Sequence, residues 1–197
     1  MATMLCFVAT DAAVEQDFLR AILPDVADNT LNMLTIDGDT STNDSLVVLA
    51  NGSAGNNPIS AGGADAESFK AALTEVLVQL TRQLAQDGEG ATRLLVAEVR
   101  GARNTHDARL AAKTIASSLL VKSALYGADP NWGRLIMALG RSGAETVESQ
   151  IDLYINDVCI MEGGRPVPFH RDAVVALMRS DEVTFGVNLN LSDGQAT

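Results

Sequence analysis

The chain has 197 residues, 47% of them hydrophobic, which is enough for one sizeable core or for a core with a smaller subdomain. Its net charge of −11 and pI of about 4.5 argue against binding to nucleic acid or to anionic membranes. The two cysteines, Cys6 and Cys159, lie in separate apolar runs without metal-ligand spacing, which predicts buried free thiols and no metal site. No apolar run approaches the ~18 residues of a membrane span and no secretory signal opens the chain, so we expect a cytoplasmic protein.

The pattern of apolar residues in the first quarter of the chain predicts both strands and a helix. Residues 4–10 form a short apolar run that is typical of a strand buried on both faces. The spacing of apolar residues over 12–23 predicts an amphipathic helix that ends at Pro24. We expect a second strand over 31–36, whereas the periodicity of 45–50 fits either a strand or a helix.

Residues 51–66 are rich in glycine, serine and asparagine, which predicts a surface loop and marks a candidate hinge between subdomains. Apolar residues at helical spacing then predict a helix over 69–84, followed by a strand over 94–99. Helical patterns return over 105–126 and 133–139. Short apolar runs between turn residues predict strands at 151–155, 158–161 and 183–189, with a helix over 171–178. This order of elements is typical of an α+β fold.

The densest polar cluster is IDGDTSTND, residues 36–44, which lies between two apolar runs. It is not a calcium loop, because counting from Asp37 places Thr42 where such a loop needs glycine and Val48 where it needs a bidentate glutamate. Two interpretations remain open. The segment is either a solvated turn with capping side chains, or a group of hydrogen-bonding side chains that the apolar flanks hold near the core.

The segment DGEGAT, residues 87–92, joins the predicted helix over 69–84 to the strand that follows. Gly88 is expected to end the helix in the left-handed conformation. Glu89 lies on this short loop beside glycine backbone, so its carboxylate is a candidate for contact with the amine or amide of a ligand.

The segment ADPNWGR, residues 128–134, precedes the predicted helix over 133–139. Asp129 or Asn131 is suited to cap that helix, and Arg134 near the helix start is expected to point toward a carboxylate of the protein or of a substrate. The two histidines lie far apart without partner spacing, and the sequence has no GxSxG segment, so the usual serine and cysteine hydrolases have little support.

Four segments, in this order, are similar to the second half of the ornithine acetyltransferase (glutamate N-acetyltransferase) family of arginine biosynthesis: MATMLCFVATDA, IDGDTSTNDSLVVLANG, DGEGAT and LVKSALYGADPNWGRLIMALGRSG. The resemblance runs from Met1 nearly to the end of the chain. It implies an α+β fold, a layered α/β sandwich of the N-terminal-nucleophile-like type that a separate α chain completes. Residues 1–197 would form the β chain, without the family's C-terminal tail, whose asparagine and final threonine bind substrate.

The resemblance also implies a site. The family cleaves itself at a bond that here corresponds to Ala2–Thr3, although Met1 and Ala2 still precede Thr3 in this sequence. Thr3 would be the nucleophile, with its own freed α-amine, of pKa about 8, as the base. Glu89 matches a substrate-binding residue. The oxyanion-hole donors would come from the α chain, and no metal takes part.

The implied reaction moves the acetyl group of N-acetylornithine to glutamate through a threonine acetyl-enzyme. It needs no cofactor, with acetyl-CoA as a further candidate donor, and the implied assembly is an (αβ)2 heterotetramer. Two alternatives stay open: an N-terminal-nucleophile aminopeptidase or amidase of related fold, and an assembly subunit without catalysis.

Overall fold

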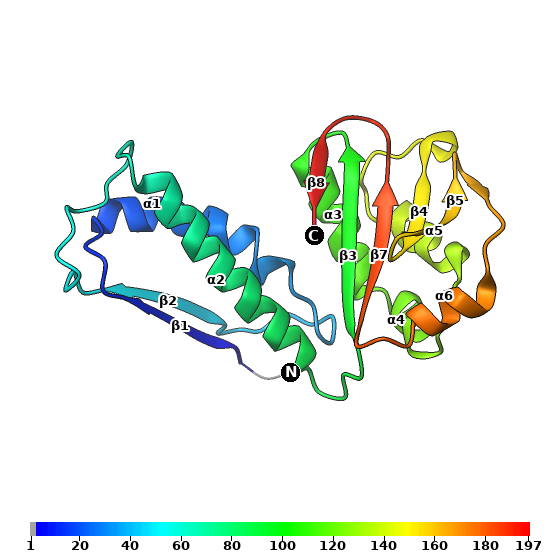
Figure 1. The fold of residues 1–197 in the computed structure, drawn as a ribbon, viewed down its shortest axis with the longest axis horizontal. Coiled ribbons are helices and arrows are strands. Elements are labelled where there is room, and N and C mark those ends of the chain that lie inside the picture. Colours follow the sequence, from blue (N-terminus) through cyan, green and yellow to red (C-terminus); the bar gives the residue numbers. More distant parts are fainter. Residues whose placement is uncertain (1–2) are drawn as a thin grey trace. The chain divides into compact units, whose positions relative to one another are not determined.

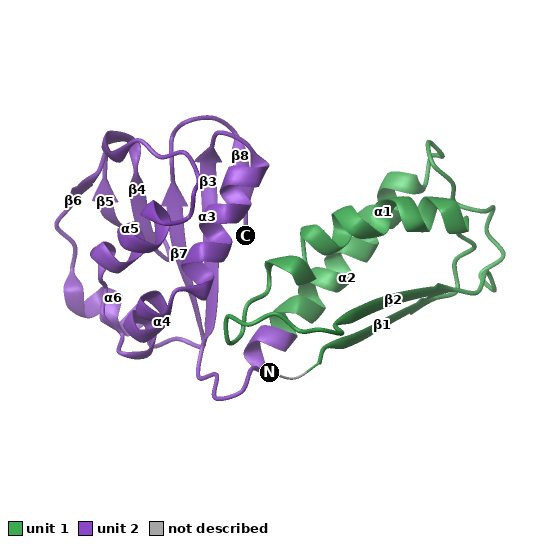
Figure 2. Cartoon of the chain, turned by 180° about the vertical axis from the view of Figure 1, so that it is seen from behind, with its two compact units in different colours: residues 1–83 green, residues 84–197 purple. Residues whose placement is uncertain are grey.

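A computed structural model describes residues 3–197, and the chain divides into two compact units, residues 1–83 and 84–197 (Figure 2). The boundary lies within the last turns of helix α2, Ala66–Gln86. The loop over 51–66, in which the sequence suggests a hinge, lies inside unit 1.

Unit 1 combines a two-stranded parallel sheet with helices on one side of it (Figure 1). Its elements are strands β1 (Leu5–Thr10) and β2 (Ser45–Ala50), helix α1 (Gln16–Asp28), the 3-10 turn η1 (Leu31–Met33) and most of α2. Phe18 of α1 and Phe69 of α2 pack with their ring centroids 6.4 Å apart, and Lys70 of α2 pairs with Asp25 of α1 at 2.8 Å. The two helices therefore form one layer.

The strands of unit 1 bury one face and expose the other. Cys6 is buried, whereas its neighbours Leu5 and Phe7 are 62% and 66% exposed. Leu49 on β2 is 56% exposed in the same way. Parallel strands are normally covered on both faces, so this pair lacks a covering layer on its apolar outer side. The predicted strand at 4–10 is confirmed, and 45–50 proves to be a strand, but within residues 3–197 the pair is not buried on both faces.

Two expectations for unit 1 are wrong. Helix α1 does not end at Pro24 but continues to Asp28, because its last turns bury Val26 at 1% exposure, which offsets the hydrogen bond that proline cannot donate. The expected strand over 31–36 is replaced by the short turn η1. There the side-chain amide of Asn32 donates to Asp28 at 2.6 Å, which continues the helical direction of α1 and competes with strand pairing.

Unit 2 is a six-stranded mixed sheet with the order β6-β5-β4-β7-β3-β8. The central pair, β3 and β7, is parallel, and all other neighbours are antiparallel. The strands are β3 (Leu94–Ala102), β4 (Asp152–Ile155), β5 (Val158–Glu162), β6 (Arg165–Pro166), β7 (Glu182–Asn188) and β8 (Gly194–Ala196).

Helices pack against one face of this sheet (Figure 1). The helical elements are α3 (Thr105–Ser117), α4 (Leu119–Tyr126), α5 (Trp132–Gly140) and α6 (Arg171–Leu177), with a 3-10 turn η2 (Glu148–Gln150). Alanines 108, 111 and 112 on α3 are at most 1% exposed, so small side chains bring this helix close to the sheet. Most predicted elements of this half are confirmed. The helical pattern over 105–126 is two helices, because Ser118 takes an extended conformation and caps α4.

Each unit thus has a sheet layer and a helix layer, and the α+β prediction is confirmed. Within residues 3–197, the helices are all too short or too polar to cross a bilayer.

Gly101 provides a test of the sheet in unit 2. Its φ is +68°, and an added Cβ would collide with Asn188 Oδ1 and lie 2.7 Å from the backbone nitrogen of Asn190. We expect Gly101→Ala to lower the free energy of unfolding by about 3 kcal/mol, because the backbone strain of an alanine at positive φ adds to the overlap of its Cβ with Asn188 and Asn190. Thermal unfolding of the intact protein measures this. Gly140→Ala, where the space is open and φ is not positive, is the matched control, and an equal loss in both variants would contradict the account.

Candidate active site

Thr3, the predicted nucleophile, lies just before β1 and continues the pairing of that strand with β2. The strands are paired in register with an offset of 40 residues. The same offset joins the residues that precede them: the Met4 N–H donates to Asp44 Oδ1 at 2.8 Å, and the Thr3 hydroxyl donates to Asn43 Oδ1 at 2.7 Å. Thr3 is exposed. Ala2, on the other side of the predicted cleavage site, lies outside the described residues.

The polar loop before β2 supplies these partners. Asn43 Oδ1 also accepts hydrogen bonds from the hydroxyls of Ser41 at 3.3 Å and Thr42 at 3.4 Å. Earlier in the loop, the Asp39 N–H donates to Asp37 Oδ1 at 2.9 Å and lowers the pKa of the Asp37 carboxyl. The loop is largely exposed, as expected for a solvated turn. Its contact with Thr3 was not predicted, and the only signal for it was the density of hydrogen-bonding side chains between two apolar runs.

Glu89, the predicted substrate-binding residue, is exposed on the loop between α2 and β3. The left-handed residue of this loop is Gly90, with φ of +72°, and not Gly88 as expected. The Ala91 N–H donates to the Gly88 carbonyl at 2.8 Å, closing a turn whose third residue needs positive φ. Thr3 belongs to unit 1 and Glu89 to unit 2.

The segment around Trp132 caps helix α5 and connects it to helix α4. Asn131 caps α5 by accepting from the Arg134 N–H at 3.2 Å, in agreement with one of the two predicted caps. The Arg134 guanidinium does not meet a carboxylate of this chain in the hydrogen bonds that the structure shows. It donates to the Leu120 carbonyl at 3.1 Å and to the Ser123 hydroxyl at 2.9 Å, which ties α5 to α4.

The cysteines are shielded from solvent to different degrees, and His170 takes part in a helix cap. Both cysteines are free, Cys6 buried and Cys159 partly buried, and burial raises the pKa of each thiol, which disfavours the reactive thiolate. His170 Nδ1 accepts from the Ala173 N–H at 3.2 Å and caps α6. In the same part of the chain, no three acidic, cysteine or histidine side chains are grouped as metal ligands.

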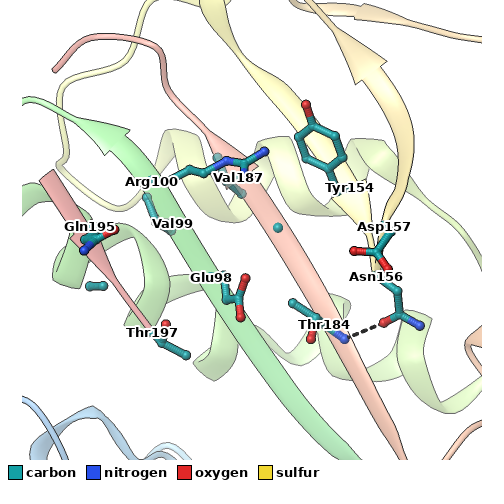
Figure 3. A pocket seen from close by; sticks show the side chains of 12 residues that line it. Glu98, Val99, Arg100, Tyr154, Asn156, Asp157, Thr184, Val187, Gln195 and Thr197 are labelled. Carbon is teal, nitrogen blue, oxygen red and sulfur yellow. Dashed lines mark hydrogen bonds between the residues drawn. The ribbon is translucent and has the colours of Figure 1, made fainter. Parts of the chain in front are cut away.

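A pocket of about 630 Å³ lies on the sheet of unit 2 (Figure 3). Its lining comes from β3, β4, β7, β8 and the turn between β4 and β5, and includes Glu98, Arg100 and Asp157. The Arg100 guanidinium lies 5.2 Å from the ring centroid of Tyr154, and the Thr184 N–H donates to Asn156 Oδ1 at 2.9 Å. Sequence reasoning missed this pocket. The signal in the sequence was the pair of charged residues Glu98 and Arg100 on either side of Val99, a spacing that places both side chains on one face of a strand.

A family model, the ArgJ family, matches residues 1–197, so the chain belongs to the ArgJ family. Proteins named arginine biosynthesis bifunctional protein ArgJ are similar along the whole chain. The relative from Symbiobacterium thermophilum is 47% identical over 197 residues, and that from Bacillus subtilis is 42% identical over 194 residues. This chain spans 49% and 48% of their lengths, about half in each case.

A solved structure shows the same fold. The crystal structure of an arginine biosynthesis bifunctional protein ArgJ from Bacillus halodurans matches with a TM-score of 0.96 and 42% identity. The match covers 98% of this chain and 92% of that chain. The mixed α+β layered fold is therefore that of the ArgJ family.

The bond between Met4 and Asp44 offers a test of how the site is held. Asp44→Ala removes the acceptor of the Met4 N–H, so we expect amide hydrogen exchange over residues 4–6 of the intact protein to become about tenfold faster. Asp44→Asn keeps an oxygen acceptor and is the matched control, with exchange close to that of the parent protein. Unchanged exchange in Asp44→Ala would show that this bond does not hold the start of β1.

Proposed function

We propose that this chain is the nucleophile-bearing β chain of a glutamate N-acetyltransferase, which moves the acetyl group of N-acetylornithine to glutamate through an acetyl ester on Thr3. The observation that carries the proposal is the ArgJ family match over residues 1–197. The position of Thr3 supports it, since an exposed hydroxyl stands at the start of the first strand with a hydrogen bond to Asn43.

The length of this chain, compared with those of its relatives, supports an enzyme made of two chains cut from one precursor. The ArgJ relatives are about twice as long as this chain, whereas the chain of the solved relative is matched over 92% of its length. We infer that the precursor is cut between Ala2 and Thr3. The cut turns the amide nitrogen of Thr3 into an α-amine of pKa about 8, which can accept a proton near neutral pH.

The reaction that we propose has two halves. Thr3 Oγ attacks the acetyl carbonyl of N-acetylornithine, its proton passes to the α-amine, and the carbon–nitrogen bond breaks as the proton is delivered to the leaving nitrogen of ornithine. The amine of glutamate then attacks the ester carbonyl, Thr3 Oγ leaves and is protonated again, and N-acetylglutamate departs. Both halves pass through an oxyanion, and loss of one oxyanion donor typically costs ~10²–10³ in rate.

The exposed face of the β1–β2 pair supports a partner chain. Leu5, Phe7 and Leu49 are each more than half exposed on a parallel sheet, a class of sheet that normally has both faces covered. We assign that cover to the other half of the precursor, the α chain, which would also supply the oxyanion donors. Two such αβ pairs in a heterotetramer, in the cytoplasm, are the assembly and location that we propose.

Thr3→Ala tests the nucleophile. Loss of the hydroxyl is expected to leave the precursor uncut and to lower acetyl transfer by at least ~10³-fold, whereas Thr3→Ser, which keeps both reactive groups, is expected to retain measurable activity. Gel analysis of processing and an assay of N-acetylglutamate formation, both with the complete two-chain protein, measure this. Thr42→Ala removes a neighbouring hydroxyl and serves as the control. Normal turnover by Thr3→Ala would reject the proposal.

The same assay separates the alternatives. An aminopeptidase or amidase would pass the acyl group to water, so free acetate would form in place of N-acetylglutamate. An assembly subunit without catalysis would keep Ala2 on every chain and carry no acetyl group. Replacing N-acetylornithine with acetyl-CoA tests whether the protein uses a second acetyl donor.

Glu89→Gln tests the substrate contact. We propose that the exposed Glu89 carboxylate binds an ammonium group of the substrate, so the neutral amide is expected to raise KM by about 10- to 100-fold, with a smaller change in kcat. Steady-state kinetics with each substrate varied in turn measure the effect. Asp87→Asn, an exposed carboxylate in the same loop, is the matched control, and equal effects of the two changes would contradict a specific role for Glu89.

A further inference from the structure

We propose that Asn43 is a positioning residue for the Thr3 hydroxyl, an inference that rests on the proposed role of Thr3 as nucleophile. Asn43 Oδ1 accepts the Thr3 hydroxyl at 2.7 Å, the shortest of its three hydroxyl contacts. The other two come from neighbours in its own loop, so Thr3 is the only one of the three that the fold must bring from a distant part of the chain.

The placement of Asn43 follows from strand register. The backbone ladder between β1 and β2 begins after Met4, where the Ser45 N–H donates to the Met4 carbonyl at 3.0 Å. One residue earlier, Asp44 Oδ1 accepts the Met4 N–H at 2.8 Å. The bond from Thr3 to Asn43 is the next step at the same offset of 40 residues. Side chains therefore extend the strand pairing to the nucleophile.

This bond orients a group that would otherwise rotate. A threonine at an exposed chain start can populate several χ1 rotamers, and a hydrogen bond worth about 1 kcal/mol favours the one that reaches its acceptor by about fivefold. A hydroxyl held in one rotamer meets the acetyl carbonyl from a fixed direction, which raises the fraction of productive encounters.

The amide is suited to this task because it is neutral. Asn43 Oδ1 accepts a hydrogen bond but does not take the proton. The bond fixes the direction of the Thr3 oxygen before the attack, and rotation about the Cβ–Oγ bond then turns the hydroxyl proton from Asn43 to the α-amine of Thr3, which remains the base. A carboxylate at the same place would attract the ammonium form of that amine and raise its pKa, which would reduce the fraction of free base near neutral pH. Position 43 thus holds the hydroxyl without changing the charge of the base.

The test measures the first half-reaction in the assembled two-chain protein. This chain is produced so that an initiator methionine directly precedes Thr3 and is removed, which makes the measurement independent of self-cleavage. Asn43→Leu keeps approximately the shape of asparagine and loses the acceptor, Asn43→Asp keeps the acceptor, and Thr42→Ala is the control because its hydroxyl contacts Asn43 more weakly, at 3.4 Å. Rapid quenching and mass measurement give the rate of acetyl-Thr3 formation against N-acetylornithine concentration and pH.

We expect Asn43→Leu to lower the maximal rate of acetyl-Thr3 formation about tenfold, with the half-saturating donor concentration within twofold of the parent. Asn43→Asp is expected to recover most of that rate at high pH, with the acidic limb of its pH profile shifted up by about one unit. The carboxylates of Asp37, Asp39 and Asp44 are unchanged in every variant, so the shift reports the new charge.

Two results would overturn the inference: a rate in Asn43→Leu equal to that of Thr42→Ala, or equal losses in Asn43→Leu and Asn43→Asp without a pH shift. Thr3→Ala is run beside these variants. If it forms the acetylated chain normally, the proposed function itself fails. If Thr3→Ala forms no acetylated chain while Asn43→Leu is acetylated at the parent's rate, only the role of Asn43 fails.

Discussion

The candidate site depends on the parallel pairing of β1 with β2. These strands are separated by a helix, a turn and a long loop, and their register places the residues just before β1 beside those just before β2. A slip of one residue would turn the buried Cys6 outward and the exposed Phe7 inward, so packing beneath α1 and α2 helps to fix the register. The same register brings Asn43 to Thr3. The core of unit 1 therefore determines where the hydroxyl stands.

In the account proposed here, the distribution of functional groups explains why this chain forms a well-defined fold and still needs a partner. Unit 1 carries the proposed nucleophile, and unit 2 carries Glu89 on the loop that follows α2. The apolar outer face of the β1–β2 pair has no cover within residues 3–197. In the account proposed here, the α chain buries that face and brings the oxyanion donors, while cleavage before Thr3 supplies the base without any further side chain.

Local patterns predicted most of the elements but not the contacts of the site. Long amphipathic helices such as α2 and apolar strands such as β1 and β3 were found because their periodicity is strong. Errors arose where tertiary packing outweighed a local rule, as in the passage of α1 through Pro24 and the turn at Leu31–Met33. The proposed roles of Thr3 and Glu89 come from the family resemblance. The role of Asn43 was missed, because its contact with Thr3 depends on the register between two strands 40 residues apart, which no short segment of the sequence reveals.

The central claim is that the Thr3 hydroxyl carries the acetyl group between donor and acceptor. The most direct measurement is peptide mapping by mass spectrometry of the complete protein after incubation with N-acetylornithine and no glutamate. We expect one acetyl ester, located on the oxygen of Thr3 and lost when glutamate is added. An acetyl group on a different residue, or a Thr3 that stays unmodified while N-acetylglutamate is still formed at the normal rate, would contradict it.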